Sequence, residues 1–321
     1  MIETGLMRTP PAGALAFEKF DARVVAPFYE RSVSAETRRA YRRVGTEFFK
    51  FLDGKHPIEI TIADVQHWRD HLTANKKSPA TVSFKLSVVR SMFDYLKIAG
   101  IVSFNPALTK LVPPPALNES LSGRALTMKE VGYLLSGPDQ RKVVGARDYA
   151  LLLLMLHTSL RVSEISALKH SSVKWSHGRW TLKFKVKGGR ERTIPLPSDV
   201  KTAIDEYLKL DRDRRHTLKS NNLESHIFQP LTNYRTLVFD KPLSRMMIFN
   251  IVRRWGEYSA VGKLSPHDLR RTAITKALDQ GLSYRQVQMM TGHKDPKTVM
   301  KYDHGRENLE QNAVNFLKYS D

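Results

Sequence analysis

The stretch Leu111-Val-Pro-Pro-Pro-Ala-Leu-Asn-Glu-Ser-Leu-Ser-Gly123 divides the sequence into two parts with different patterns. A run of three prolines cannot continue a helix, because proline lacks a backbone N–H group and clashes with the preceding turn. Such a run favours an extended spacer. We therefore predict a linker over residues 111–123. The chain has 321 residues, which is enough for a domain on each side of this linker.

The part before the linker predicts a small helical domain over residues 23–110, preceded by a flexible arm, or one short helix, over residues 1–22. Three amphipathic helices are expected in it. They begin at Ser34, Thr61 and Ser78, which are residue types suited to cap a helix N-terminus. Basic side chains are expected on the outer faces of these helices, where they can contact phosphate groups. These are Arg38, Arg39, Arg42, Arg43, Lys76, Lys77, Lys85 and Arg90.

The part after the linker, residues 124–321, predicts a mixed α+β domain. An apolar run over residues 149–156 predicts a buried helix. From Trp180 to Lys187 apolar and polar side chains alternate, which predicts a strand, and Gly188-Gly189 predicts the turn to a return strand over residues 192–196. Further helices are expected over residues of about 199–210, 244–260, 266–280, 283–291, 296–303 and 306–318. The predicted fold class is mainly α with a small β-sheet, in two domains.

The composition favours a polyanionic partner. The chain has 52 Lys and Arg against 32 Asp and Glu, a formal net charge of +20. Such an excess is typical of proteins that bind nucleic acid, although a solvated basic surface without a partner has the same composition. There is no cysteine, which excludes disulfides and Cys-ligated zinc. The N-terminus has no apolar signal core, and the longest apolar run is too short to span a bilayer. We expect a cytoplasmic protein without a membrane partner.

Two of four notable segments lie in the first half of the second domain. In Thr158-Ser-Leu-Arg161-Val-Ser-Glu164 an arginine directly follows the buried helix. Arg161 can hold a phosphate through two N–H groups, and Glu164 can orient it, although an ordinary surface ion pair explains the same spacing. Lys187 stands beside the Gly-Gly turn, from which a lysine can reach into a groove. A solvated lysine is the alternative, and Lys185 competes for the role.

The other two segments lie near the C-terminus. In Ser265-Pro-His267-Asp-Leu-Arg270 the proline suits a helix start, so His267 and Arg270 share one face near a helix N-terminus, a place suited to phosphate. A helix cap with surface charges is the alternative. The fourth segment carries Gly292-His293 and, nine residues after the histidine, Tyr302. Each motif alone is weak, but the ordered set is hard to obtain by accident.

In this order and spacing, the motifs resemble the tyrosine recombinases, also called phage-type integrases, and in particular the simpler members related to the Xer proteins. The resemblance covers nearly the whole chain after residue 22. It implies a helical SAM-like core-binding domain, a linker and an α+β catalytic domain that together clamp DNA. By match it implies two phosphate-binding arginines, a supporting acid, a hairpin lysine, two histidines and a nucleophile. These are Arg161 and Arg270, Glu164, Lys187, His267 and His293, and Tyr302.

The resemblance also implies a chemistry. The arginines and a histidine stabilise the charge of the transition state, Tyr302 forms a 3′-phosphotyrosyl link, Lys187 protonates the leaving 5′-hydroxyl, and His267 helps to take the tyrosine proton. No metal or other cofactor is expected. The expected partner is double-stranded DNA with specific recombination sites. The expected assembly is a homotetramer on DNA, or a heterotetramer with a related recombinase, and accessory proteins remain open.

The sequence departs from the family pattern at three places. Ser159 stands where glycine is common, Met290-Thr291 replaces an apolar-Leu pair before the Gly-His motif, and Arg271 occupies a position often held by histidine. None of these changes removes a group with an implied role. Two alternative functions remain, a type IB topoisomerase-like DNA relaxation and a non-catalytic DNA-binding protein. A metal-dependent transposase is less favoured, because the sequence lacks the acidic cluster that would bind its metal ions. The helix over 306–318 can dock either on a neighbouring protomer or on its own domain.

Overall fold

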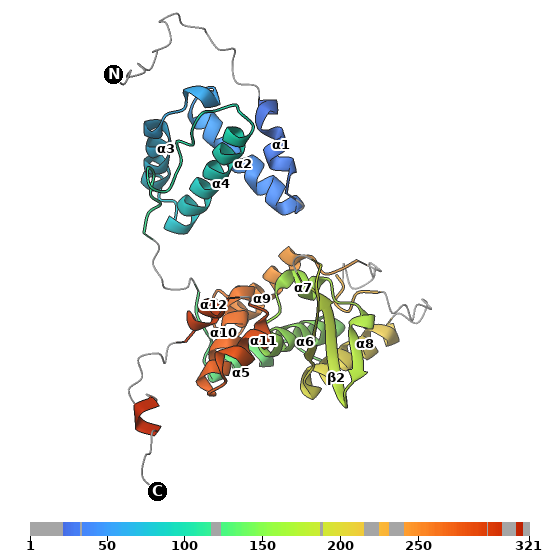
Figure 1. The fold of residues 1–321 in the computed structure, drawn as a ribbon. Helices are drawn as coiled ribbons and strands as arrows, with labels where there is room; N and C mark the ends of the chain where they lie inside the picture. The colour runs from blue at the N-terminus through green and yellow to red at the C-terminus, as the bar shows by residue number, and fades with distance from the viewer. Residues whose placement is uncertain are drawn as a thin grey trace, which may run out of the picture. The chain divides into compact units, whose positions relative to one another are not determined.

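The computed structural model describes residues 22–32, 34–116, 123–186, 189–214, 225–230, 241–293, 295–303 and 313–316. The chain forms two compact units, residues 1–119 and 120–321 (Figure 1). The predicted fold class is confirmed, because the described residues are mostly helical and contain one small antiparallel sheet. None of the described helices combines the length and the apolar character that crossing a bilayer requires.

The first unit contains the three predicted helices and one more. Within the described residues its helices are α1 (Ala26–Glu30), α2 (Ala35–Phe51), α3 (Ile62–Ala74) and α4 (Pro79–Ile98), with 3-10 turns at Ala22–Val25 and Pro57–Glu59. The three predicted N-caps are confirmed, since the side-chain oxygens of Ser34, Thr61 and Ser78 each accept a backbone N–H from the first turn of the helix that follows. The sequence pattern had not indicated α1.

Aromatic side chains fill the core of the first unit. The Phe48 and Trp68 rings meet edge to face with centroids 4.9 Å apart. From α1, Phe28 is fully buried. Its neighbour Tyr29 packs against Gly45 of α2, where an added Cβ would lie 1.9 Å from the phenolic oxygen, so only glycine leaves this space. Burial raises the pKa of Tyr29 to about 12. Helix α1 is therefore part of the folded unit.

The basic residues predicted on the outer faces of this unit fall into two groups. Arg39, Arg43, Lys76 and Lys77 are exposed, and Arg42 is exposed in an ion pair with Glu30, which also pairs with the half-buried Arg38. Lys85 is buried and pairs with Glu47, and half-buried Arg90 donates to the carbonyl oxygen of Ala107. The outer-face prediction was wrong for Lys85, because the apolar stripe of α4 is wider than its spacing indicated and includes this position.

The second unit is a mixed helical and sheet domain. Within the described residues its helices are α5 (Met128–Ser136), α6 (Val143–Thr158), α7 (Val162–Ser166), α8 (Ser198–Arg214), α9 (Arg245–Tyr258), α10 (Pro266–Asp279), α11 (Tyr284–Thr291) and α12 (Pro296–Met300), with 3-10 turns at His170–Ser172 and Ala313–Phe316. The strands β1 (Val173–Ser176), β2 (Arg179–Lys185) and β3 (Glu191–Pro195) pair antiparallel in this order.

The sheet has one strand more than the sequence pattern indicated. Strand β1 joins β2 through His177 and Gly178, which both have positive φ angles of 54° and 69°. Two such residues in succession form the tight turn that suits the twist of a hairpin. The predicted alternation of β2 is confirmed in part: Leu182 and Phe184 are buried and Lys183 and Lys185 are exposed, whereas Thr181 is also buried.

Helix α6 is the centre of the second unit and packs against both α8 and α10 (Figure 1). It is longer than the predicted 149–156 because its first turns are not purely apolar: Asp148 is fully buried in them. Its carboxylate accepts hydrogen bonds from Arg147, Arg254 and the indole N–H of Trp255, the last at 2.8 Å. These bonds compensate the buried charge and attach α6 to α9.

Some predicted features lie outside the described residues. They concern Lys187 and Gly188 of the hairpin turn, almost all of the N-terminal arm over 1–22, and the central part of the linker. Of the helix predicted over 306–318, only residues 313–316 are described, and they form a 3-10 turn.

The end of α6 generates a prediction on stability. Ser159 follows the helix with a φ angle of 51°, is fully buried, and its hydroxyl has no hydrogen-bond partner among the described residues. The left-handed conformation strains any residue with a Cβ, and the unpaired hydroxyl adds a desolvation cost. Replacing Ser159 with glycine should therefore stabilise the second unit by about 1 kcal/mol, which is roughly 2–4 °C in thermal midpoint.

The matched control is Ser159→Ala, which removes the hydroxyl but keeps the Cβ. Differential scanning calorimetry on both variants separates the two contributions. A glycine variant that melts at or below the wild-type temperature would contradict the strain at this position.

Candidate active site

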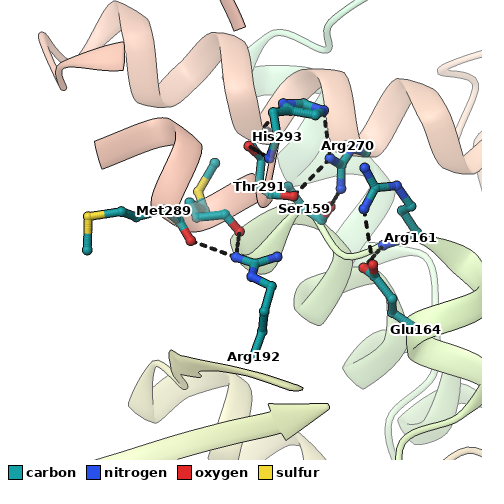
Figure 2. Close-up of polar contacts among 9 residues, drawn as sticks. Ser159, Arg161, Glu164, Arg192, Arg270, Met289, Thr291 and His293 are labelled. Atoms are coloured by element: carbon teal, nitrogen blue, oxygen red, sulfur yellow. Dashed lines mark hydrogen bonds and ion pairs between the residues drawn. The ribbon is translucent and has the colours of Figure 1, made fainter. Parts of the chain in front are cut away.

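Arg270 lies at the centre of a cluster of polar residues in the second unit (Figure 2). It stands on the second turn of α10, whose start is capped by Asp268 through the backbone N–H of Ser265 at 2.8 Å. The Arg270 side chain is buried, and its guanidinium donates to the carbonyl oxygens of Ser159 and, at 3.2 Å, of Thr291. Burial and the nearby Arg161 lower the pKa of Arg270 to about 10, so it remains a cation at neutral pH.

Arg161 stands where the chain turns from α6 into α7. The buried carboxylate of Glu164 accepts the backbone N–H of Arg161 at 2.8 Å and pairs with its guanidinium at 3.1 Å. The Arg161 side chain keeps 42% of its surface exposed, so the guanidinium is oriented by Glu164 and still open to a ligand. The predicted supporting function of Glu164 thus has a geometric basis.

His293 contacts the same cluster from the turn after α11. Its Nε2 lies 3.0 Å from a guanidinium nitrogen of Arg270, and its Nδ1 lies 3.0 Å from the hydroxyl oxygen of Thr291. A guanidinium only donates, so Nε2 accepts and Nδ1 carries the proton. Burial, then the positive charges of Arg270, Arg161 and Arg192, lower the pKa of His293 to about 4. The imidazole is therefore neutral at pH 7.

Tyr302 lies beside His293. The two rings are stacked with centroids 6.4 Å apart and planes at 15°. Helix α12 ends at Met300, so Tyr302 sits in a turn two residues beyond the helix and not in its last turn as predicted; its backbone N–H donates to Val299 at 2.9 Å. The ring is half-buried against a small apolar cluster that includes Val299. The tyrosine and the cationic cluster are therefore neighbours within one chain.

The structure thus brings together five of the residues predicted for the site: Arg161, Glu164, Arg270, His293 and Tyr302. His267 is exposed on the first turn of α10, one turn before Arg270, and no described hydrogen bond connects it to the cluster. Lys187 lies outside the described residues. Lys185, the alternative to it, is exposed at the end of β2.

Arg192 is a member of the cluster that the sequence motifs did not indicate. This arginine on β3 is half-buried, and its guanidinium donates to the carbonyl oxygens of Met289 at 2.6 Å and Met290 at 3.3 Å (Figure 2). A signal was present in the strand pattern: Arg192 and the buried Ile194 are two residues apart, so they lie on the same face. An arginine at a core-facing position of a strand requires a buried hydrogen-bond acceptor, because a buried charge without a partner costs free energy.

Arg271, one of the three departures, binds the chain that enters the second unit. Its guanidinium donates to the carbonyl oxygen of Gly123 at 2.7 Å. Next to it, the side chains of Asp268 and Thr272 accept the backbone N–H groups of Arg124 at 3.0 Å and Leu126 at 2.9 Å. The end of the predicted linker is therefore attached along the helix that carries Arg270.

A helical unit followed by a unit that gathers two arginines, a histidine and a tyrosine defines an enzyme class that acts on the DNA backbone. The family comparisons agree over both units. Residues 124–308 match the phage integrase family, and residues 28–100 match the phage integrase N-terminal SAM-like domain. The chain belongs to the phage integrase family of tyrosine recombinases, and it is a DNA strand-transferring enzyme of site-specific recombination.

Similar proteins cover both units. The chain is 30% identical to the tyrosine recombinase XerD of Xanthomonas axonopodis pv. citri (strain 306), over 91% of this chain and 93% of that protein. It is 29% identical to the tyrosine recombinase XerC of Thermodesulfovibrio yellowstonii, over 86% and 87%. A lambda integrase dimer bound to a core site has the same fold, with a TM-score of 0.67 at 18% identity over 89% of this chain and 95% of that chain.

The lowered pKa of His293 generates a prediction on pH. Between pH 6.5 and pH 4 the unfolded chain protonates this histidine and the folded chain does not, so the folded state loses stability as the pH falls. His293→Gln keeps an amide donor and acceptor but does not titrate. Thermal midpoints are measured for the wild type and the variant at pH 7.0, 5.5 and 4.5. As the pH falls, the midpoint of the wild type should decrease more than that of the variant, so the difference between them should shrink. Parallel curves would show that His293 is not held neutral.

Proposed function

We propose that the protein recombines DNA through a 3′-phosphotyrosyl intermediate formed by Tyr302. The observation that carries this proposal is the stacking of Tyr302 on His293, which itself is hydrogen-bonded to the buried Arg270. A candidate nucleophile and a candidate phosphate-binding cation are thereby neighbours in the DNA-free chain.

The cationic cluster suits the charge that develops during the reaction. Arg161 is oriented and partly exposed, whereas Arg270 is buried and oriented by two carbonyl groups. Preorganised donors of this kind stabilise the additional negative charge of a pentavalent phosphorane without reorganisation of solvent. A bound phosphate also offsets the mutual repulsion of the arginines and favours protonation of His293, since a nearby anion raises the pKa of an imidazole.

In the proposed step, the phenolic oxygen of Tyr302 forms a bond to phosphorus and loses its proton to a base, for which exposed His267 is the candidate. The bond between phosphorus and the 5′-oxygen breaks, and this oxygen takes a proton from Lys187. The phosphodiester is replaced by a phosphotyrosyl ester, so the 5′-hydroxyl of a partner strand can reverse the step without ATP.

Complete exchange between two duplexes requires four such sites, so we place the protein in a tetramer on DNA. A homotetramer is the simplest form, and a heterotetramer with a related recombinase has the same geometry. Solved structures with this fold include recombinases bound to DNA, such as XerH with a palindromic difH substrate. We place this activity on nucleoid DNA in the cytoplasm. Integration, excision, transposition and resolution are all compatible with it.

Replacing Tyr302 with phenylalanine should abolish covalent protein–DNA adducts and leave DNA binding intact, because only the phenolic oxygen is removed. The substrate is a pool of nicked duplexes of randomised sequence, from which the wild type selects its own site as a denaturant-resistant adduct. Adducts formed by the variant would refute the nucleophile. Binding without adducts by the wild type would favour a non-catalytic protein. Exchange between two labelled duplexes separates recombination from topoisomerase-like relaxation alone.

The exposed arginines of the first unit generate a second prediction. Replacing Arg39 and Arg43 together with alanine should weaken DNA binding and reduce the slope of log affinity against log salt by about 2, since each arginine that neutralises a phosphate releases about one counterion. Lys85→Ala is the contrasting variant. It should lower the thermal midpoint, because it leaves Glu47 without its buried partner, and should leave the salt slope unchanged. An unchanged slope for the Arg39/Arg43 variant would exclude these residues from the interface.

A further inference from the structure

The C-terminal end of α11 is held by two arginines from other elements. A helix leaves its last four carbonyl groups without partners inside the helix. In α11 these are the carbonyls of residues 288–291. The backbone N–H of Gly292 donates to Gln288 at 2.7 Å, and Arg270 donates to Thr291 at 3.2 Å. Arg192 donates to the remaining two, those of Met289 and Met290.

The contact between Arg192 and the end of α11 requires a residue without a side chain at position 292. Gly292 has a φ angle of 71°, and an added Cβ would lie 2.3 Å from a guanidinium nitrogen of Arg192. The absent side chain therefore provides the space that the guanidinium occupies. On its other side, Arg192 lies over the ring of Phe184, 5.5 Å from its centroid, and pairs with the same residue across the β2–β3 ladder. The arginine is thus fixed at both ends.

The turn that Arg192 holds is the one that presents His293. Figure 2 shows Arg192 reaching from the strand to the helix end, while Arg270 reaches the same turn from the opposite side. The imidazole of His293 then takes its orientation from Thr291 through Nδ1 and from Arg270 through Nε2. A shift of the helix end would move Thr291 and His293 together.

We propose that Arg192 is a positioning residue for the recombination reaction, which acts through His293 by fixing the end of α11 to the sheet. The inference rests on the proposed function, since it concerns the same site. Its charge also belongs to the cluster, because it contributes to the lowered pKa values of Arg270 and His293. Arg192 itself donates to protein carbonyls, so its effect reaches the phosphate indirectly.

The test uses the DNA site that the wild type selects in the adduct assay, at saturating protein, with single-turnover cleavage as the readout. Arg192→Ala should slow cleavage about 100-fold, the loss typical of a reacting group displaced by about 1 Å. Arg179→Ala is the matched control: it removes an exposed arginine from the same sheet and should retain the wild-type rate. Binding of both variants is measured in a Tyr302→Phe background and should be equal.

A double-mutant cycle with His293→Ala decides whether Arg192 acts through the histidine. If it does, Arg192→Ala in the His293→Ala background should change the rate by less than about 3-fold, because non-additivity marks residues that act together. An equal loss of about 100-fold in both backgrounds would overturn the proposal and assign Arg192 a direct or merely structural role. Because the wild type forms adducts in the same assay, this failure is distinct from failure of the proposed function.

A readout independent of cleavage covers the case in which His293→Ala is too slow to measure. The Nδ1–H of His293 is bonded to Thr291, so in ¹⁵N-histidine-labelled protein its proton should give a protected signal at pH 7. Arg192→Ala should lose this protection, whereas Arg179→Ala should keep it. Retention of the protected signal in Arg192→Ala would contradict the positioning function.

Discussion

The buried guanidinium of Arg270 is the interaction on which the geometry of the site depends. A cation that is removed from water requires acceptors in fixed positions, and here they come from the end of α6, from the end of α11 and from the imidazole of His293. Elements that are more than 100 residues apart in sequence thereby meet at one side chain. Moving any of them would leave a buried charge without its partners, so the arrangement is set before DNA binds.

This constraint also explains why two helices end as they do. Both Ser159 and Gly292 have left-handed backbone conformations, with φ angles of 51° and 71°. In each case the chain turns sharply after the helix, and a carbonyl group beside the turn points at an arginine instead of at solvent. Glycine accepts this conformation without strain, whereas the serine at the end of α6 does not.

Local patterns predicted most of the helices, because helix caps and apolar spacing act over a few residues, whereas the set of site residues came from the resemblance to a family. The N-caps at Ser34, Thr61 and Ser78 illustrate this. Features that depend on distant partners escaped prediction. The ion pair of Lys85 requires Glu47 on another helix, and the function inferred for Arg192 depends on carbonyl groups almost 100 residues further along the chain. Burial of a charged group follows from tertiary contacts, which periodicity within one element does not contain.

The electrostatics of the free site favour the arrival of an anion. Burial, together with the positive charge of Arg161, lowers the pKa values of Arg192, Arg270 and His293, and His293 is neutral as a result. The negative charge of Glu164 opposes this repulsion, but its carboxylate already accepts hydrogen bonds from Arg161. A phosphodiester placed among these groups supplies the missing negative charge, and the further charge of the transition state supplies more. The same repulsion that is unfavourable in the free protein therefore makes binding of the reacting phosphate stronger as the reaction proceeds, which is the condition for catalysis.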